Sequence, residues 1–375
     1  MTQRKLTVLQ LLPSLNSGGV ERGTLEVARH LVRNGHRSLV MSSGGRMVAQ
    51  LTDEGSEHYL WPVDKKSPWT FRLIWKLRRF LREHRVDILH VRSRMPAWVA
   101  YLAWRGMPPA SRPHFVTTVH GLYSVSAYSA VMTKGERVIA VSDTVRAYLL
   151  RSYPAVADAH IRVIPRGVDP DEFPYGFKPA DAWLEAWHKQ YPQLGGKKVL
   201  LLPGRLTRLK GHEFFIELIR RLKNRGLAVH GLVVGGEDPK RQRYAAEIRK
   251  KMTDAGLADD MTFAGHRSDL REIMAVSDMV FSLSTKPESF GRTTLEALSL
   301  GVPVIGFAHG GVGEQLAHLL PQGGIPLGDE DALEALAAAW VLSPPSVPQS
   351  RMLTLQRMLD STLDVYEEVM AQGVT

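Results

Sequence analysis

Cysteine is absent from this 375-residue chain, so disulfide bonds, thiolate metal sites and cysteine nucleophiles are excluded. Histidines and carboxylates show no metal-ligand spacing, and we expect neither a metal site nor a bound cofactor. Uncharged apolar runs stay short of the roughly 18 residues that a membrane-spanning helix needs, which argues against an integral membrane protein. The 32 glycines and 22 prolines follow no repeat, so the chain is not collagen-like. With 44% hydrophobic and 23% charged residues, the composition is that of a globular protein.

The first residues imitate a secretory leader only in part. Arg4 and Lys5 precede a short apolar run at 6–12, but Gln10 interrupts this run and Pro13 ends it. Because no small-residue cleavage site follows, the run predicts a buried strand instead. The lack of cysteine also suits a reducing compartment. We therefore expect a cytoplasmic protein, either free or peripheral on the cytoplasmic face of the inner membrane.

Positive charge is concentrated in the first half of the chain, although the whole chain carries a formal net charge of +10. Residues 1–178 hold 26 Lys and Arg against 14 Asp and Glu, whereas residues 179–375 hold 22 against 24. Such an asymmetry indicates an anionic partner for one half: nucleic acid, an anionic lipid or a phosphorylated substrate.

The densest basic segment, at 65–105, combines eleven Lys and Arg with six interleaved Trp and Phe residues. Within 69–84 the basic side chains recur at helical spacing, and Ile74, Leu77 and Leu81 form an apolar row on another side. This pattern predicts a basic amphipathic helix. It is either an ordinary surface helix packed on a sheet or an element that binds a membrane or another anionic partner; nucleic acid is disfavoured because its sequence signatures are missing. The surface for a membrane or an anionic partner would consist of Lys65, Lys66, Arg72, Lys76 and Arg79.

Short β-branched and leucine-rich runs alternate with helical patterns along the chain, which is typical of parallel sheets wound with helices. This alternation breaks at the proline-rich stretch 165–196 and then restarts, so we expect two doubly wound α/β domains. The first seven strands are expected at 6–12, 38–42, 58–63, 87–91, 115–119, 138–141 and 161–164, and five more at 199–202, 229–234, 261–263, 279–283 and 302–306.

The same breaks predict the domain boundaries. An N-terminal domain is expected at 1–170, a linker with a short helix at 171–196, and a second domain at 197–345. A last helical stretch within 346–375 is free to pack on either domain, including back on the N-terminal one. Ligands of such sheets bind beyond the carboxyl ends of the strands, where the next motifs lie.

Two motifs follow strands of the first domain. Gly18 and Gly19 stand after the first strand and open a helix, an arrangement that admits a phosphate at the helix N-terminus but equally fits a plain turn. His120 ends the fifth strand and precedes a glycine, so it either contacts a ligand or is a structural histidine.

Two motifs follow strands of the second domain. Gly204 and Arg205 begin a short loop that ends at Lys210, where an arginine and a lysine can converge on a diphosphate. Glu288 and Glu296 flank a helix start near Gly291, whose N–H groups would face a phosphate while Glu296 accepts hydrogen bonds from a vicinal diol. A glycosidase carboxylate pair is the rival reading, but it leaves the phosphate-binding loops unexplained.

The ordered set of motifs resembles glycosyltransferase family 4, and the resemblance covers almost the whole chain. It rests on the glycine pair at 18–19, His120-Gly121, the 138–142 and 163–169 segments, Gly204-Arg205 with Lys210, Gly265, and the Glu288 to Glu296 motif. This resemblance implies a GT-B architecture of two facing Rossmann-like domains, with the acceptor bound by 1–170 and the nucleotide sugar by 197–345. It also implies a metal-independent, retaining transfer from a nucleotide diphosphate sugar.

The resemblance also implies roles for individual residues. The implied catalytic residues are Arg205, Lys210, Glu288 and His120. The implied donor-binding residues are Gly18, Gly19, Gly204, Gly265, Phe290, Gly291, Arg292, Thr293 and Glu296. One position departs from the family, because Arg166 stands where an asparagine is usual, and its direction is open between the interdomain cleft and solvent.

A UDP-sugar is the broadest expectation for the donor. The basic first half favours a lipid-linked or phosphorylated glycan acceptor, such as a lipopolysaccharide core. The alternatives are a GT-B nucleotide-sugar epimerase, which would act without an acceptor, and a non-catalytic sugar-binding protein, which would have no use for Arg205 and Lys210.

Overall fold

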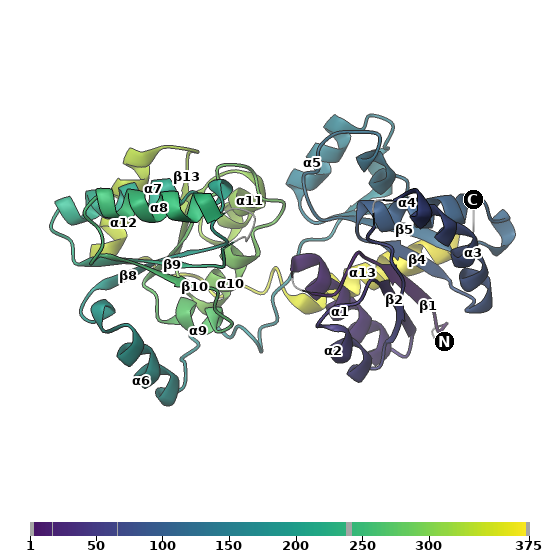
Figure 1. Ribbon diagram of the computed structural model, residues 1–375, viewed down its shortest axis with the longest axis horizontal. Helices are drawn as coiled ribbons and strands as arrows, with labels where there is room; N and C mark the ends of the chain where they lie inside the picture. The colour runs from purple at the N-terminus through teal and green to yellow at the C-terminus, as the bar shows by residue number, and fades with distance from the viewer. Residues whose placement is uncertain (1–3, 17, 66, 238–241, 373–375) are drawn as a thin grey trace. The chain divides into compact units, whose positions relative to one another are not determined.

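The computed structural model describes residues 4–16, 18–65, 67–237 and 242–372. The chain divides into two compact units. Unit 1 comprises Met1–Arg166 together with Gln356–Thr375, and unit 2 comprises Gly167–Leu355. Each unit contains one parallel β-sheet with helices (Figure 1), which confirms the expected α/β fold of two doubly wound domains.

Unit 1 has a seven-stranded parallel sheet in the order β3-β2-β1-β4-β5-β6-β7. The order reverses between β1 and β4, as in Rossmann-like folds. The strands are β1 (Thr7–Leu11), β2 (Arg37–Ser42), β3 (Glu57–Leu60), β4 (Ile88–Val91), β5 (His114–Val119), β6 (Arg137–Ala140) and β7 (Ile161–Val163). The helices are α1 (Gly19–Arg33), α2 (Val48–Asp53), η1 (Pro68–Arg72), α3 (Leu73–Glu83), α4 (Arg94–Arg105), η2 (Pro109–Ser111), η3 (Ser129–Thr133), α5 (Asp143–Ser152) and η4 (Asp158–His160).

Unit 2 has a six-stranded parallel sheet in the order β10-β9-β8-β11-β12-β13. Its strands are β8 (Lys198–Pro203), β9 (Val229–Val234), β10 (Met261–Gly265), β11 (Met279–Ser282), β12 (Val304–Phe307) and β13 (Gly324–Ile325). Its helices are α6 (Asp181–Gln190), η5 (Pro192–Leu194), η6 (Arg208–Lys210), α7 (His212–Asn224), α8 (Gln242–Asp254), α9 (Leu270–Ala275), α10 (Arg292–Leu300), α11 (Gly310–Leu319), η8 (Pro321–Gly323) and α12 (Glu330–Leu342).

The segment 171–196, expected as a linker, is part of unit 2. Its helix α6 is held by aromatic side chains: the Trp183 indole donates a hydrogen bond of 2.8 Å to Asp269, and Trp187 is buried. The first passage between units therefore lies at Arg166 and Gly167 rather than at residue 170. Proline density indicated a break in the alternation, but the packing of the tryptophans decides where the segment belongs.

The last helix, α13 (Leu355–Gln372), packs on unit 1 (Figure 1, yellow). Tyr366 is fully buried, and its hydroxyl lies 2.6 Å from Nδ1 of His90 on β4. Glu368 pairs with Arg137 at 2.8 Å and also with Arg162. These contacts explain why α13 packs on the sheet of unit 1 although it follows unit 2 in the chain.

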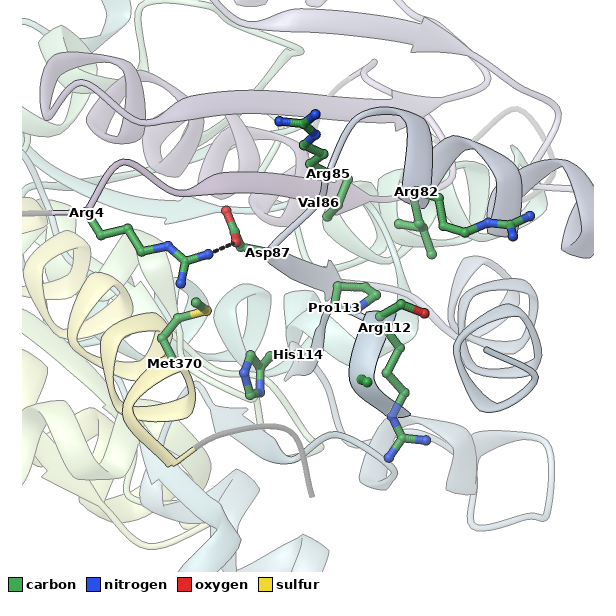
Figure 2. Close-up of a pocket in the computed structure, with 12 residues that line it drawn as sticks. Arg4, Arg82, Arg85, Val86, Asp87, Arg112, Pro113, His114 and Met370 are labelled. Carbon is green, nitrogen blue, oxygen red and sulfur yellow. Dashed lines mark hydrogen bonds and ion pairs between the residues drawn. The ribbon is translucent and has the colours of Figure 1, made fainter. Parts of the chain in front are cut away.

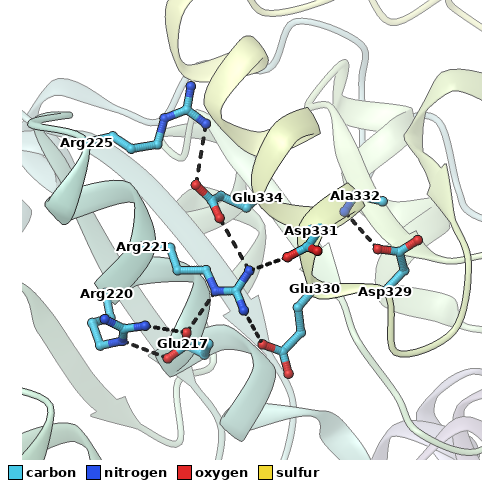
Figure 3. A network of polar contacts seen from close by, with 9 residues as sticks. All are labelled: Glu217, Arg220, Arg221, Arg225, Asp329, Glu330, Asp331, Ala332 and Glu334. Carbon is cyan, nitrogen blue, oxygen red and sulfur yellow. Dashed lines mark hydrogen bonds and ion pairs between the residues drawn. The ribbon is translucent and has the colours of Figure 1, made fainter.

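In unit 2, α7 and α12 are joined by an ion-pair network around Arg221 (Figure 3). The guanidinium pairs with Glu217 on its own helix at 2.8 Å and with Glu330 of α12 at 3.0 Å. It also reaches Asp331 and Glu334 of α12. Arg221 therefore links acidic residues from two helices. Within the described residues, no helix combines the length and the apolarity needed to cross a membrane.

Candidate functional site

The carboxyl ends of β8, β9 and β10 form a closely packed edge of the unit 2 sheet. The N–H of Gly204 donates to the carbonyl of Val234 at 2.8 Å, and that of Gly235 donates to the carbonyl of Gly265 at 2.9 Å. A Cβ on Gly235 would lie 1.8 Å from the carbonyl oxygen of Gly204, so this approach requires glycine. Two predicted donor-binding glycines, Gly204 and Gly265, thus lie at one edge of the sheet. Residues 238–241 of the next loop lie outside the described residues.

The loop after β8 places two basic side chains differently. Arg205 is exposed and forms no ion pair with any described residue. Lys210 ends η6 and is partly buried. The loop is fastened to the one after β11, because the N–H of Thr285 donates to the carbonyl of Leu209 at 2.9 Å. The two loops that carry Lys210 and Glu288 are therefore adjacent.

Lys210 and Glu288 form an ion pair, with Nζ 2.7 Å from Oε1. The Ser284 hydroxyl donates to the same carboxylate. Burial alone would raise the pKa of Glu288, but the Lys210 ammonium and the Ser284 hydroxyl outweigh it and lower that pKa. Glu288 is therefore a carboxylate at neutral pH and a hydrogen-bond acceptor. The sequence placed both residues at the site, but it did not show that they pair.

The loop after β12 and the helix that follows it hold the backbone around Glu288 by hydrogen bonds. The sequence did not predict this contribution. The N–H of Gly311, at the start of α11, donates to the carbonyl of Glu288 at 2.8 Å. The ring Nε2 of His309 lies 2.7 Å from the carbonyl of Ser284, so this nitrogen donates. Gln315 donates to the carbonyls of Phe290 and Gly291. The glycine pair 310–311, separated from the end of β12 by two residues, was the available sequence signal.

Helix α10 begins immediately after Gly291, as the spacing of the motif predicted, and Gly291 occupies its N-cap with φ 88°. The backbone N–H groups of Arg292 and Thr293 have no acceptor within the helix, whereas that of Thr294 donates to the carbonyl of Gly291 at 3.1 Å. Glu296 is buried one turn later and accepts a 3.1 Å contact from Nε of Arg292. Arg292 therefore orients the carboxylate assigned to a ribose.

In unit 1, Gly18 is the N-cap of α1 and Gly19 is its first residue. A Cβ built on Gly19 would meet nothing within 4 Å, so open space lies beside this helix start. The helix extends for fifteen residues behind it. The Glu21 carboxylate lies beside Gly18 at the same helix start. The approach of a phosphate to this N-terminus therefore stays a prediction.

His120 follows β5 and contacts Arg166, whose direction the sequence left open. Nη2 of Arg166 lies 2.5 Å from Nδ1 of His120. The guanidinium also lies against Gly23 of α1 and the sulfur of Met358 on α13. Burial, followed by the positive charges of Arg166 and Arg92, lowers the pKa of His120 well below its ordinary value. Because a guanidinium only donates, the neutral ring accepts on Nδ1 and carries its proton on Nε2.

A cavity of about 480 Å³ opens on the opposite edge of the unit 1 sheet (Figure 2). It lies near Asp87, directly before β4, and His114, the first residue of β5. Arg4 is paired with Asp87 at 2.8 Å, and the side chains of other arginines around the cavity point in different directions. This cavity at the amino ends of the strands is therefore separate from the predicted site at their carboxyl ends.

Metal-binding geometry is not found among the described residues: no three His, Asp or Glu side chains there are grouped as metal ligands. The predicted basic surface is described at Lys65, Arg72, Lys76 and Arg79, which are all exposed, whereas Lys66 lies outside the described residues.

Comparison with known proteins yields two family matches in chain order. The sequence model of Glycosyltransferase Family 4 matches residues 17–172, and that of Glycosyl transferases group 1 matches residues 185–350. Mannosylfructose-phosphate synthase of Agrobacterium fabrum is 31% identical over 183 residues, which cover 47% of this chain but only 38% of that protein. N-acetyl-alpha-D-glucosaminyl L-malate synthase of Bacillus anthracis is 26% identical over 321 residues, with 82% and 79% of the two chains covered.

Solved structures with the same fold are also found. A glycosyltransferase from Rickettsia africae superimposes with a TM-score of 0.84 at 29% identity, over 98% of this chain and 99% of that one. The Anabaena protein Alr3699/HepE, solved with UDP-glucose, has a TM-score of 0.81 at 20% identity, over 97% and 100%. The two family matches together span most of both units. The chain is therefore a glycosyltransferase of family 4 with the GT-B fold.

Proposed function

We propose that this enzyme transfers a sugar, with retention of anomeric configuration, from a nucleotide diphosphate sugar to an anionic glycan acceptor. UDP-sugar is the proposed donor, and a lipid-linked or phosphorylated acceptor of the lipopolysaccharide core type is the proposed acceptor. The observation that carries the proposal is the Lys210–Glu288 pair beside the N-terminus of α10. The relatives support the donor class, because Alr3699/HepE was solved with UDP-glucose.

The reaction leaves two negative charges on a nucleoside diphosphate. Lys210 and the exposed Arg205 supply positive charge from one loop, and the N-terminus of α10 supplies oriented N–H groups. Such groups stabilise the departing diphosphate without the need for a protein-bound metal. Glu296, oriented by Arg292, accepts hydrogen bonds from the ribose hydroxyls.

Glu288 is proposed to bind hydroxyls of the donor sugar. Its second oxygen, Oε2, has no contact among the hydrogen bonds described, whereas Oε1 is shared by Lys210 and Ser284. In unit 1, the proposed contacts are the neutral His120, whose Nε2–H donates to a sugar hydroxyl, and Gly19 at the start of α1.

The covalent step needs no general base from the protein. The acceptor oxygen forms a bond to the anomeric carbon on the face from which the diphosphate leaves. The bond between the anomeric carbon and the phosphate oxygen breaks, and its electron pair stays on that oxygen. The same oxygen takes the acceptor proton, so the protein residues bind and orient but transfer no proton.

A donor screen followed by two variants tests the proposal. A thermal-shift panel of UDP-, GDP- and ADP-sugars identifies the donor, because a ligand that binds only the folded protein raises its melting temperature. Lys210→Ala and Glu288→Ala should each then lower turnover about 10²–10³-fold, as loss of a preorganised contact at a developing charge does. Arg208→Ala is the matched control, because Arg208 lies on the same loop but is 64% exposed and pairs with Glu247.

The outcomes separate the competing functions. Folded Lys210→Ala and Glu288→Ala proteins with unchanged turnover would remove this pair from the site. Conversion of the donor without any acceptor would favour the epimerase alternative, and donor binding without turnover of any acceptor would favour a sugar-binding protein.

A further inference from the structure

Two tryptophans on η1 and α3 lie mostly in solvent. Trp69 is 69% exposed and Trp75 is 71% exposed, and Phe71 is exposed beside them. The other six tryptophans of the chain are buried or partly buried. Scattered exposed apolar residues are ordinary, but large rings gathered on one short segment mark an interaction site. This segment therefore indicates a binding site for a ligand or partner that has an apolar component.

The aromatic residues face outward because the opposite side of α3 belongs to the core. Leu77, Phe80 and Leu81 are buried, and α3 packs against α4. At 100° per residue, Trp75 and Lys76 lie on the other side of the helix from Leu81. The expected surface helix is confirmed, with Phe80 added to its apolar face. Its packing leaves Trp69 and Trp75 mostly in solvent.

Arginines hold both rings in place. The guanidinium carbon of Arg72 lies 4.6 Å from the ring centre of Trp69, and that of Arg78 lies 4.6 Å from the ring centre of Trp75. Arg78 is itself anchored, because it donates to the carbonyls of Leu102 and Ala103 near the end of α4 at 3.0 and 3.1 Å. Trp75 is therefore stacked on a fixed cation and directed outward.

The surroundings of the two rings are positively charged. Arg72, Lys76 and Arg79 on this side of the segment are exposed, and so is Lys65 just before it. Glu83 is the acidic residue of α3, and its charge is balanced by Arg79 at 2.6 Å. A partner with negative charge at its surface and apolar groups beneath complements both features.

We propose that this surface, defined by Trp69, Arg72, Trp75, Lys76 and Arg79 and named here the α3 surface, docks on an anionic phospholipid bilayer. Tryptophan rings favour the headgroup level of a membrane, with an apolar body below and an N–H toward water. The basic side chains contact lipid phosphates, while their aliphatic parts lie along the apolar region. A nucleic acid would also contact the basic side chains. However, the segment carries no base-binding motif, so a nucleic acid would leave the two outward tryptophan rings without a role.

The charge component is tested by vesicle flotation. Full-length protein should float with phosphatidylcholine vesicles that contain phosphatidylglycerol and not with phosphatidylcholine alone. Each basic side chain near an anionic surface strengthens binding about fivefold, so Arg72→Gln, Lys76→Gln and Arg79→Gln together should weaken it about 100-fold. The matched control removes three exposed charges from α8 of unit 2, through Arg243→Gln, Lys250→Gln and Lys251→Gln, and should leave binding unchanged.

The aromatic component is tested separately. Wild-type tryptophan fluorescence should be quenched by brominated anionic lipid, and Trp69→Ala with Trp75→Ala should remove most of that quenching while circular dichroism stays unchanged. Equal flotation with neutral vesicles, or equal losses in the α3 and α8 triple variants, would overturn the proposal. So would concentration-dependent dimerisation through the α3 surface, or a duplex DNA that displaces the protein from vesicles. The test needs no transfer assay, so it stands independently of the proposed reaction.

Discussion

Gly211 joins Lys210 to the start of α7, and its replacement by alanine should damage unit 2 severely. The residue is in the left-handed region, with φ 72° and ψ 28°, which costs a residue other than glycine about 1–2 kcal/mol. A Cβ at this position would also lie 2.0 Å from the carbonyl oxygen of Leu283 and 2.7 Å from its Cβ. The chain must therefore move by about an ångström, and such overpacking adds about 1–3 kcal/mol. We expect Gly211→Ala to cost about 2–5 kcal/mol of stability in total.

The same unit offers two matched controls. Gly226 and Gly256 have φ of 75° and 70°, close to that of Gly211, but a Cβ on either would meet nothing within 4 Å. Gly226→Ala and Gly256→Ala should therefore show only the conformational cost of about 1–2 kcal/mol. The difference between Gly211→Ala and these controls measures the clash alone.

Two measurements check this expectation. Urea unfolding gives the stability of each variant, and hydrogen exchange in α7 and β8 shows whether the loss is confined to unit 2. The thermal stabilisation by UDP should also fall in Gly211→Ala, because the displaced loop carries Lys210. Equal destabilisation by all three substitutions would refute the reasoning, since the close approach to Leu283 would then have no energetic effect.

Three other predictions follow from the contacts. Arg166→Gln should raise the pKa of His120, since burial lowers it first and the Arg166 charge lowers it further; imidazole NMR measures this shift, and an unchanged pKa would contradict the effect of the Arg166 charge. Arg221→Met should destabilise unit 2 by about 1 kcal/mol at low salt. The pKa of Glu217 is lowered to about 2, first by the hydrogen bond from Arg220 and then by that from Arg221. Glu217 therefore stabilises the folded state at pH values above its ordinary pKa, and this stabilisation is lost as the pH falls toward 2. The difference in unfolding free energy between wild type and Arg221→Met should therefore shrink over that range, and a constant difference would contradict the role of Glu217. Transfer activity should survive exhaustive EDTA treatment, and activity that returns only with Mn²⁺ would contradict a metal-independent reaction.

The sheets were predictable from sequence because buried parallel strands are short, almost wholly apolar runs. All twelve expected strands are present, with ends shifted by a few residues. The edge strand β13, with only Gly324 and Ile325, was missed because two residues carry no periodic signal. The start of α10 was also predictable, because a glycine at position 291 suits the N-cap of the helix that follows.

Contacts between distant segments were not predictable in the same way. Lys210 and Glu288 are separated by 78 residues, and the sequence placed each on a loop after a strand without showing that they pair. The direction of Arg166 depends on the space beside Gly23 and on the position of Met358, which only the packing of α1 and α13 defines. Fold class follows from local patterns, whereas the partners of charged side chains depend on tertiary packing.

The discontinuous composition of unit 1 has a consequence for biosynthesis. Strands β4, β6 and β7 leave the ribosome before unit 2, but Tyr366 and Glu368, which contact His90, Arg137 and Arg162, are synthesised after it. At about 5–20 residues per second, the nascent sheet waits roughly 10–40 s for its last helix. During that interval His90 lacks its tyrosine partner, and the apolar surface that α13 later covers is open to chaperones. Synthesis of α13, rather than completion of the sheet, therefore determines when unit 1 reaches its final packing.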